Sequence, residues 1–502
     1  MNSHTLAHLR RFTDRRVLVV FWLGLSSGFP WVIIGTALTL WLQEHGLSRS
    51  TIGYFGAVFA AYSVNFLWSP LVDRLKLPGV GVRKGWILLG QLVIIAGAWL
   101  MAEQSPDQSL KHLAALALLV AVAAATHDIA IDAFRIDSFQ AHETEPLTAA
   151  SSAATAGWWT GYAGLGFVPL WLSDTGWSWP ELYRLMACMM AFIGLVAWVI
   201  AREPSVDRAQ ALSPLAQQYR QQLGYFSPGR LVASLGVLVV LVLILLLTLA
   251  DQLSVTMAAT AVFPVLLAAV WLWRRPPSKI RYEASGWHRL SVWLLLSVVA
   301  PFQEFFQRNG VRLALSLLLF IFLFKIGEAF LGRMSVVFYK ELGFSNTDIA
   351  TYSKLMSWWI TIVFSLLGGF FTMWFGVVKG LMVGGIAMAA SNLLFSLMAV
   401  VGPSIPLYAF TVLVDGFCQA WSTVAFVAFL SALSNRAFSA TQYALMASLG
   451  TFARTLLSAY SGALVDWLDG NWALFFALTT LMVIPSLWLL WRMRDRLEAL
   501  FR

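Results

Sequence analysis

Residues 113–137, LAALALLVAVAAATHDIAIDAFRID, place charged side chains at the end of a long apolar run. The run is suited to a lipid bilayer, yet it leads into Asp128, Asp132 and Arg135. On a helix, positions i, i+4 and i+7 fall on one stripe, whereas Asp137 points another way. A charge inside a bilayer costs several kcal/mol unless it faces a partner or water. These three residues are therefore candidates for a functional site inside a membrane-spanning helix.

The composition predicts an all-α polytopic membrane protein. The chain has 502 residues, of which 59% are hydrophobic and 12% charged, and its mean hydropathy is +0.73. Apolar runs of about 20 residues recur, each long enough to cross a hydrocarbon core of roughly 30 Å. The net charge is +9, but Lys and Arg cluster between the apolar runs. We therefore interpret them as topology signals rather than as a nucleic-acid surface.

The apolar runs predict about 14 spans, arranged as six, two and six. They lie near 17–42, 51–72, 84–102, 112–134, 147–172, 180–201, 230–250, 256–273, 313–339, 347–375, 378–400, 405–432, 441–466 and 472–492. We therefore expect an N-terminal six-helix bundle over 1–202 and a C-terminal one over 312–502. The linker, 203–311, carries a transmembrane hairpin at about 230–273. Its last part, 285–310, is apolar and aromatic but interrupted by Pro301, which predicts a helix lying at the membrane interface.

Basic residues predict the orientation of the chain. Arg10, Arg11, Arg15 and Arg16 precede the first span, and Arg492, Arg494 and Arg496 close the chain. The alternate loops EQSPDQS, SDTGWSWP and DQLSVTM carry neither Lys nor Arg. The positive-inside rule therefore places both termini and the central linker in the cytoplasm.

A motif after the second span resembles the signature of major facilitators. Residues 69–85, SPLVDRLKLPGVGVRKG, place an acidic–basic pair ahead of glycines and a basic pair. Two bundles joined by a cytoplasmic linker also match the plan of that superfamily. In such an arrangement Asp73 can cap a helix or pair with a base of the opposite half, so that it latches the cytoplasmic side. The other members of this predicted latch are Arg74, Arg83, Lys84 and Arg135. The alternative is that these cations only set topology.

Four further stretches resemble the AmpG muropeptide permeases of Gram-negative bacteria. They are FLWSPLVDR, HDIAIDAFRID, FKIGEAF and NRAFSATQYAL, and the similarity runs in order through all twelve facilitator spans. The resemblance implies proton-driven import of N-acetylglucosaminyl-1,6-anhydro-N-acetylmuramyl peptides across the bacterial inner membrane for cell-wall recycling. It also implies a link to β-lactam resistance in some species. Two features depart from the family: the hairpin lies between the halves, and Asn65 stands where relatives often carry a lysine.

Charged residues in the second half are candidates for substrate binding. Lys325 and Glu328 are neighbours on one helix face, and Lys354, Asp415 and Arg454 lie in later spans. In one interpretation Lys325 and Glu328 merely neutralise each other. In the other they line a central cavity, where transporters of this kind bind substrate, and Lys325, Lys354 and Arg454 bind the carboxylates of the peptide.

Aromatic and polar residues in the first half are candidates for a surface that faces the sugar. Tyr62 and Asn65 share a face of the second span, and Trp159 and Tyr162 lie in the fifth. Aromatic faces stack on sugar rings, although the chain has 24 Trp and most of them must serve packing.

Proton coupling is expected at the carboxyls of the opening stretch. A carboxyl group removed from water can bind and release a proton during transport. Arg135 lies closer to Asp132 than to Asp128, so Asp128 is the first choice and Asp132 its ion-paired neighbour. Glu328 is a second candidate site, because moving about two negative charges inward against the potential requires at least two protons. The alternative is a wholly structural charge network connected to Asp73.

The same features favour a transporter over other classes. A membrane enzyme would need a large catalytic loop or a metal site, and an ATP-driven pump would need a phosphate-binding loop, none of which is found in the sequence. We expect no cofactor, no metal and no nucleic-acid partner, and a monomer that binds a small glycopeptide, protons and the lipid bilayer. Among transporters, the alternatives are a carrier for acetyl-coenzyme A and a general sugar or peptide importer.

Overall fold

The chain is almost entirely helical. The computed structural model describes residues 3–48, 51–52, 55–77, 79–173, 175–249, 255–274, 285–345, 348–458 and 460–501. Within these ranges the β-structure is limited to one isolated bridge between Leu77 and Gly81. The predicted all-α class is confirmed.

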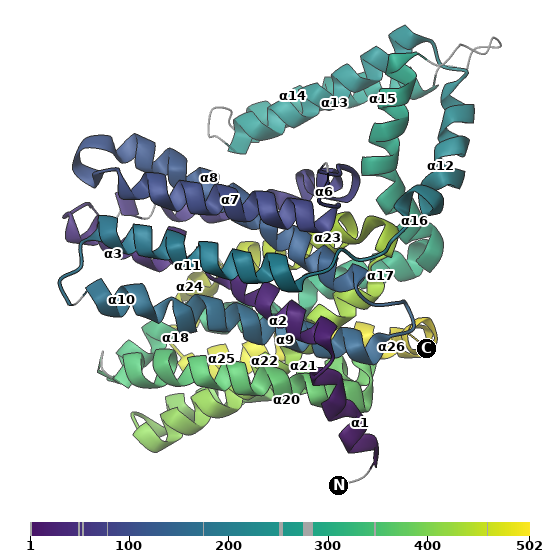
Figure 1. Cartoon of the computed structure of the whole chain (residues 1–502). Helices are drawn as coiled ribbons and strands as arrows, with labels where there is room; N and C mark the ends of the chain where they lie inside the picture. Colours follow the sequence, from purple (N-terminus) through teal and green to yellow (C-terminus); the bar gives the residue numbers. More distant parts are fainter. Residues whose placement is uncertain are drawn as a thin grey trace. The chain divides into compact units, whose positions relative to one another are not determined.

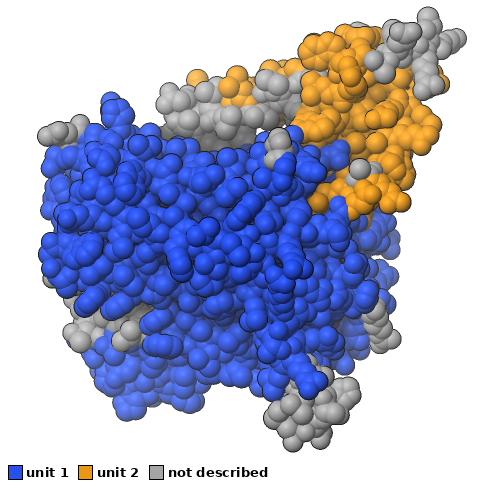
Figure 2. Space-filling model, in the orientation of Figure 1, with its two compact units in different colours: residues 1–206, 306–502 blue, residues 207–305 orange. Residues whose placement is uncertain are grey.

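The helices form two compact units, coloured separately in Figure 2. Unit 1 comprises residues 1–206 and 306–502, and unit 2 comprises residues 207–305. The two predicted six-helix bundles thus pack into a single unit. The segment predicted as the linker, 203–311, contains the whole of unit 2.

The first half of unit 1 runs from α1 to α11. Its elements are α1 (Ser3–Phe12), α2 (Arg15–Gly28), η1 (Val32–Ala37), α3 (Leu38–Glu44), η2 (Gly56–Phe59), α5 (Ala60–Val64), η3 (Asn65–Leu67), α6 (Ser69–Arg74), α7 (Arg83–Ala102), α8 (Pro106–Asp137), α9 (Thr144–Trp159), η4 (Thr160–Leu165), α10 (Phe167–Ser173) and α11 (Trp179–Ile200). The elements η1 and η4 are wide π-helical turns that interrupt the first and fifth spans.

The second half of unit 1 follows unit 2 and ends the chain. Its elements are α17 (Val311–Phe324), α18 (Ile326–Leu342), η6 (Ile349–Met356), α20 (Ser357–Phe375), α21 (Val377–Val401), α22 (Ile405–Leu433), η7 (Arg436–Phe438), α23 (Ser439–Ser458), α24 (Ser461–Trp467), α25 (Trp472–Met482) and α26 (Ile484–Leu500). The helices of this half pack on those of the first half mainly through α9 with α20, and through α8 and α6 with α23.

Both ends of the chain lie at the same end of unit 1 (Figure 1). His8 is 3.6 Å from the Glu145 carboxylate at the start of α9. The hydroxyl of the neighbouring Thr144 donates to the carbonyl oxygen of Phe501, which follows the last helix. We call this the terminal end of unit 1. It is the end that the basic residues predict to be cytoplasmic.

Glycines bring α2 and α9 into close contact. A Cβ atom added to Gly28 would overlap with the carbonyl oxygen of Trp158, and one added to Gly161 would overlap with that of Leu25. Side chains larger than hydrogen would therefore push the two helices apart. This contact fixes where the residues that follow Gly28 and Trp158 lie.

Ten helices in the described part of the chain are long and apolar enough to cross a membrane. The chain is a multi-pass membrane protein, whereas the predicted count of fourteen spans stays a prediction. The described residues of the predicted hairpin form α13 (Pro228–Leu249) and α14 (Val255–Arg274), which pack on each other in unit 2.

The expected break at Pro301 is wrong. Unit 2 also contains α12 (Arg208–Leu223), α15 (Gly286–Leu294) and η5 (Leu295–Val299), and η5 leads directly into α16 (Ala300–Asn309). The π-helical turn η5 directly precedes Pro301. Because this turn is wider than an α-helical one, it makes room for the proline ring and does not need the N–H that proline lacks, and the helix continues. Residues 286–309 are among the ten apolar helices, and their placement at the membrane interface stays a prediction.

Candidate functional site

A buried charge cluster joins the two halves at the terminal end. Arg83, whose side chain is fully buried, donates from Nη2 to Asp73 at 2.6 Å and from Nε to Asp137 at 2.7 Å. The same guanidinium donates to the hydroxyl of Ser439 in the second half at 2.7 Å. We call Asp73, Arg83, Asp137, Ser439 and Thr441 the inter-half cluster.

Asp73 caps a helix of the opposite half. Its carboxylate accepts hydrogen bonds from the backbone N–H groups of Ala440 and Thr441, at 3.1 and 2.8 Å, and from the Thr441 hydroxyl at 2.6 Å. These N–H groups belong to the first turn of α23, where the helix dipole favours a negative charge. A charge from the first half thus completes a helix of the second half.

The other residues of the predicted latch lie in different surroundings. Arg135 bonds to Asp132 at 2.6 Å and to the Ser431 hydroxyl of the second half at 3.2 Å. Arg74 interacts electrostatically with Asp73. Lys84 turns away from the cluster, since its ammonium donates to the Trp198 carbonyl and lies 4.2 Å from the centre of that indole ring.

Sequence reasoning missed four residues of this region, namely Asp137, Arg436, Ser439 and Thr441. Asp137 leaves the stripe of Asp128 and Asp132, and its own stripe faces the start of α7 and the second half. Ser439 donates to Asp137 at 2.8 Å, and Arg436 donates to the Asp137 carbonyl at 2.6 Å. The signal available was the stretch NRAFSAT itself, whose small hydroxyl residues begin a helix.

Asp128 lies in the interior of unit 1. It accepts a short hydrogen bond from the Ser27 hydroxyl of α2. It is nine residues before α8 ends, so it lies about 14 Å from the terminal end at 1.5 Å per residue. Asp132, one turn closer to that end, forms the ion pair with Arg135.

Three further polar side chains, from α2, α7 and α8, are hydrogen-bonded to one another next to Asp128. The Ser26 hydroxyl is 3.2 Å from His127 Nε2, and Gln91 donates to the same hydroxyl at 3.0 Å. All three side chains are buried. The consecutive residues Ser26 and Ser27 thus hold the consecutive residues His127 and Asp128 and fix α2 against α8.

Charged residues of the second half meet where a helix is interrupted. Lys325 lies between α17 and α18 and is ion-paired with Glu328. Its ammonium also donates to the hydroxyls of Ser422 and Thr423, at 3.0 and 2.9 Å. A break inside a span is tolerated where it lines a cavity or is covered by protein, as in many transporters.

Asp415 and Arg454 belong to the same region. Asp415 accepts hydrogen bonds from Ser391 at 2.7 Å and from Gln419 at 2.6 Å. Arg454 is exposed and interacts electrostatically with both Lys325 and Glu328. Lys354 falls within η6, but its side chain lies outside the described residues.

The predicted sugar-facing residues divide into two groups. Tyr62, Trp159 and Tyr162 belong to a set of half-buried aromatic rings in the first half. Asn65 instead accepts a hydrogen bond from the Ser448 hydroxyl of α23 at 3.1 Å. It therefore contributes to the contact between the halves.

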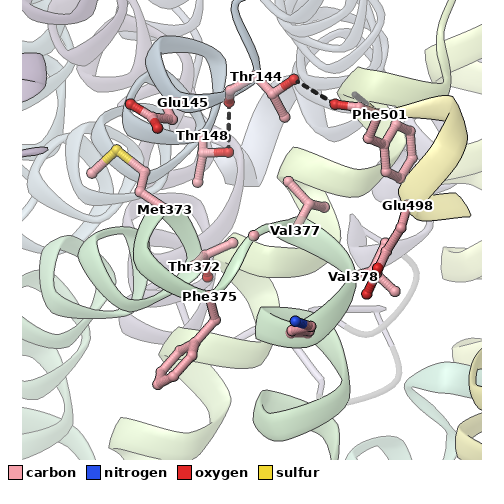
Figure 3. Close-up of a pocket in the computed structure, with 12 residues that line it drawn as sticks. Thr144, Glu145, Thr148, Thr372, Met373, Phe375, Val377, Val378, Glu498 and Phe501 are labelled. Atoms are coloured by element: carbon pink, nitrogen blue, oxygen red, sulfur yellow. Dashed lines mark hydrogen bonds between the residues drawn. The ribbon is translucent and has the colours of Figure 1, made fainter. Parts of the chain in front are cut away.

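Two hollows open at the terminal end. One of about 410 Å³ is lined by residues that include Arg15, Arg202, Glu203 and Arg436. The other, of about 280 Å³, lies between the start of α9, the turn from α20 to α21 and the last helix (Figure 3). The larger hollow also borders Asp137 of the inter-half cluster. Neither hollow is lined by Asp128, Lys325 or Arg454. Within the described ranges, no three His, Cys, Asp or Glu side chains are grouped so as to hold a metal ion.

Comparison with known proteins shows which fold the chain has. The sequence profile described as Major Facilitator Superfamily matches residues 20–250. The solved structure of the proton:xylose symporter XylE bound to 6-bromo-6-deoxy-D-glucose matches with a TM-score of 0.60, at 14% identity and over 95% of each chain. The first half of the chain is thus similar to the major facilitator superfamily, and the whole chain has the fold of a solved facilitator. The similarity is to transporters, the class that the sequence predicted.

Relatives match the chain over nearly its full length. A protein of Rickettsia felis named as a putative AmpG transporter is 27% identical over 492 residues, which cover 97% of this chain and 99% of the relative. The anhydromuropeptide permease of Escherichia coli K12 is also 27% identical over 492 residues, covering 98% and 82% of the two chains. The resemblance to AmpG transporters thus extends along nearly the whole chain.

Proposed function

We propose that this protein imports N-acetylglucosaminyl-1,6-anhydro-N-acetylmuramyl peptides together with protons. The observation that carries the proposal is the 27% identity to an anhydromuropeptide permease over 98% of the chain. The half-buried rings of Tyr62, Trp159 and Tyr162 in the first half and the cations Lys325 and Arg454 in the second support it, because the substrate combines sugar rings with a carboxylate-bearing peptide.

The proposal places the terminal end in the cytoplasm of a bacterium and the chain in its inner membrane. The basic residues that precede α2 and end α26 support this orientation. With the inter-half cluster formed, the halves are joined at the cytoplasmic side, and substrate enters from the periplasm. Asp73, Arg83 and Asp137 then act as the latch that must open before release.

Proton binding at Asp128 is the proposed means of coupling, and it needs no cofactor. The carboxyl lies in the interior next to α2, so its charge influences how α2 and α8 pack. A tetrapeptide-bearing substrate carries about two negative charges, and each costs about 2.3 kcal/mol per 100 mV of inside-negative potential. Import therefore requires at least two protons, and Glu328 is the candidate for the second.

Uptake into proteoliposomes tests the substrate. The purified protein should accumulate labelled anhydromuropeptide when the external pH is lower than the internal pH. An excess of unlabelled anhydromuropeptide should block this uptake, whereas acetyl-coenzyme A and xylose should leave it unchanged. Accumulation of labelled acetyl-coenzyme A or of a simple sugar, without that of anhydromuropeptide, would assign the protein to the alternative carriers.

The variant Asp128→Asn tests the coupling site. It should abolish accumulation driven by the gradient while exchange of labelled for unlabelled substrate continues, because binding survives and proton coupling does not. The matched control is Asp107→Asn, which changes an exposed carboxylate near the other end of the same helix and should behave like wild type. Accumulation by Asp128→Asn at the wild-type level would move the coupling site elsewhere.

A further inference from the structure

Six aromatic rings from three segments meet in the first half of unit 1. Trp31 contacts Phe59, Tyr62 and Trp158, with ring centres 4.6, 4.8 and 5.5 Å apart. Trp158 in turn contacts Trp159 at 5.4 Å and Tyr162 at 5.2 Å. We call these six residues the aromatic wall. The sequence points to Tyr62, Trp158, Trp159 and Tyr162 as candidates, whereas Trp31 and Phe59 are added by the structure.

The backbone around the wall departs from regular helix at two matching points. Trp31 directly precedes the π-helical turn η1, and Trp159 directly precedes the π-helical turn η4. Wide turns of this kind occur mostly at functional sites, because they change the direction of side chains and weaken the hydrogen-bond ladder. The close contact of α2 with α9 at Gly28 brings the two points together.

The wall does not have the character of a sealed core. All six rings are half-buried, although they lie deep in the protein. The indole nitrogen of Trp31 and the hydroxyl of Tyr62 are buried, and they interact with each other without forming a well-aligned hydrogen bond. Buried polar atoms usually form well-aligned hydrogen bonds, and a hydroxyl-bearing ligand would give both atoms a better partner.

Charged groups of the second half lie at a similar depth. Trp31 follows the start of α2 by 16 residues, and Trp158 follows the start of α9 by 14. Lys325 and Arg454 follow the starts of α17 and α23 by 14 and 15 residues. At 1.5 Å per residue, all four lie about 21–24 Å from the terminal end. Lys325 already forms an ion pair with Glu328, whereas Arg454 is exposed and is therefore the better candidate to bind a carboxylate of the ligand.

We propose that the aromatic wall is a pyranose-binding surface, and that a bound glycopeptide lies across the two halves with its carboxylates at Arg454. The electron-rich faces of the rings suit the C–H faces of sugars, and guanidinium groups bind carboxylates with two parallel hydrogen bonds. The carboxylate of Asp128 interacts electrostatically with Tyr62 of the wall. Its negative charge would repel the carboxylates of a ligand, so these are expected to lie away from the wall. This inference rests on the proposed function and adds the orientation of the substrate.

Equilibrium binding of three ligands to the purified full-length protein tests the orientation. The ligands are the N-acetylglucosaminyl-anhydro-N-acetylmuramyl disaccharide, the same disaccharide bearing a tetrapeptide, and the free tetrapeptide. Trp31→Leu and Trp158→Leu should raise the Kd of both disaccharide ligands by one common factor, roughly three- to tenfold, and leave that of the tetrapeptide unchanged. Arg454→Gln should raise the Kd of the two peptide-bearing ligands by about tenfold or more and spare the bare disaccharide.

Controls separate this proposal from a general loss of structure. Trp467→Leu removes an indole that is 76% exposed and should bind all three ligands like wild type. Trp31→Phe keeps a ring and should stay close to wild type, and Trp159→Leu replaces Trp31→Leu if that variant fails to fold. An unchanged disaccharide Kd in the tryptophan variants, or a weakened disaccharide in Arg454→Gln, would overturn the orientation. A wild-type protein that binds none of the three would instead refute the proposed function.

Discussion

Asp73 stands out among the charged residues because one carboxylate accepts from four donors. They are a guanidinium of its own half and, in α23, two backbone N–H groups and the Thr441 hydroxyl. Because these partners lie on both halves and are buried, the energy of the contact is lost when the halves separate. The cluster therefore stabilises one conformation of the protein more than others.

The variant Asp73→Asn should shift unit 1 toward a conformation that is open at the terminal end. It keeps an acceptor oxygen but removes the charge that pairs with Arg83. Removing one partner of a buried ion pair costs up to about 3–5 kcal/mol, so we expect at least a tenfold change in population. The measurement is the rate at which a maleimide labels Ser152→Cys, a position buried between the halves, with Cys188 and Cys418 replaced by serine.

Asp495→Asn is the matched control for this measurement. Asp495 lies on α26, its side chain is 88% exposed, and it pairs with the adjacent Arg494. Its loss should leave labelling unchanged, because exposed pairs contribute little. If Asp73→Asn also labels at the wild-type rate, the inter-half cluster is not what holds the terminal end closed.

Glu143, in the loop before α9, should make stability depend on pH. Hydrogen bonds from the Arg16 guanidinium, one of them 2.8 Å long, hold the pKa of Glu143 below its usual value. The ionised form is thus the one stabilised by folding, and this contribution is present at neutral pH and lost as pH falls below about 4.5. Glu143→Gln should lower the free energy of unfolding by about 1 kcal/mol at pH 7 and less at pH 4.

Thermal unfolding in detergent at the two pH values measures this effect. Glu103→Gln is the control, because Glu103 pairs with Arg184 at a comparable 2.9 Å, but its side chain is 51% exposed against 22% for Glu143. A Glu143→Gln variant that loses equal stability at both pH values would show that the ion pair is not the cause.

At the scale of elements, the tightest contact is the one between α2 and α9. Gly28→Ala should destabilise the protein by about 1–3 kcal/mol, since its Cβ would overlap with a backbone carbonyl that no rotamer can relieve. Gly236→Ala is the matched control, because it lies inside α13 with no atom within 4 Å of the added Cβ. That change should be neutral or slightly stabilising. Thermal unfolding of the two variants, side by side, measures the difference.

The same contact shows what the sequence could and could not predict. The pattern G-x-x-x-G at 24–28 and 157–161 is a visible sign of two helices that approach closely, and it could have been recognised. The π-helical turns could not, because an extra residue in one turn shifts the phase of every side chain after it. Trp31 was therefore not recognised as facing Tyr62 and Trp158.

Helical periodicity likewise predicted the partners within one helix better than those between helices. The pairs Lys325–Glu328 and Asp132–Arg135 follow from i,i+3 spacing, and both are present. Asp137 leaves the stripe of Asp128 and Asp132 as predicted. The partners of Asp137 and Lys84 could not be predicted, because the spacing of residues does not say which neighbouring helix each face meets. The turn at η5, which lets the helix pass through Pro301, depends on local geometry in the same way.

At the scale of the molecule, the hairpin α13–α14 of unit 2 should be dispensable for transport. Deleting residues 230–275 and joining the ends with a flexible linker removes these two helices, which pack mainly on each other and on α15. Unit 1 keeps its own core, both halves and all candidate site residues. Uptake should therefore remain measurable in a deletion variant that is expressed and inserted like wild type. A correctly inserted deletion variant without any uptake would assign the hairpin an essential role.

The glycine-lined contact has a mechanical consequence. Two helices whose backbones mesh cannot slide along each other, so α2 and α9 move as one stiff lever. Nearer the terminal end this pair of helices contacts α20, where the Ser152 hydroxyl donates to the Ser365 carbonyl at 2.6 Å. When that contact opens, the two helices rotate together, and Trp31 and Trp158 move with them. A small opening at one end of the protein is thereby transmitted about 10 Å further along the helices, at 1.5 Å per residue, to the rings.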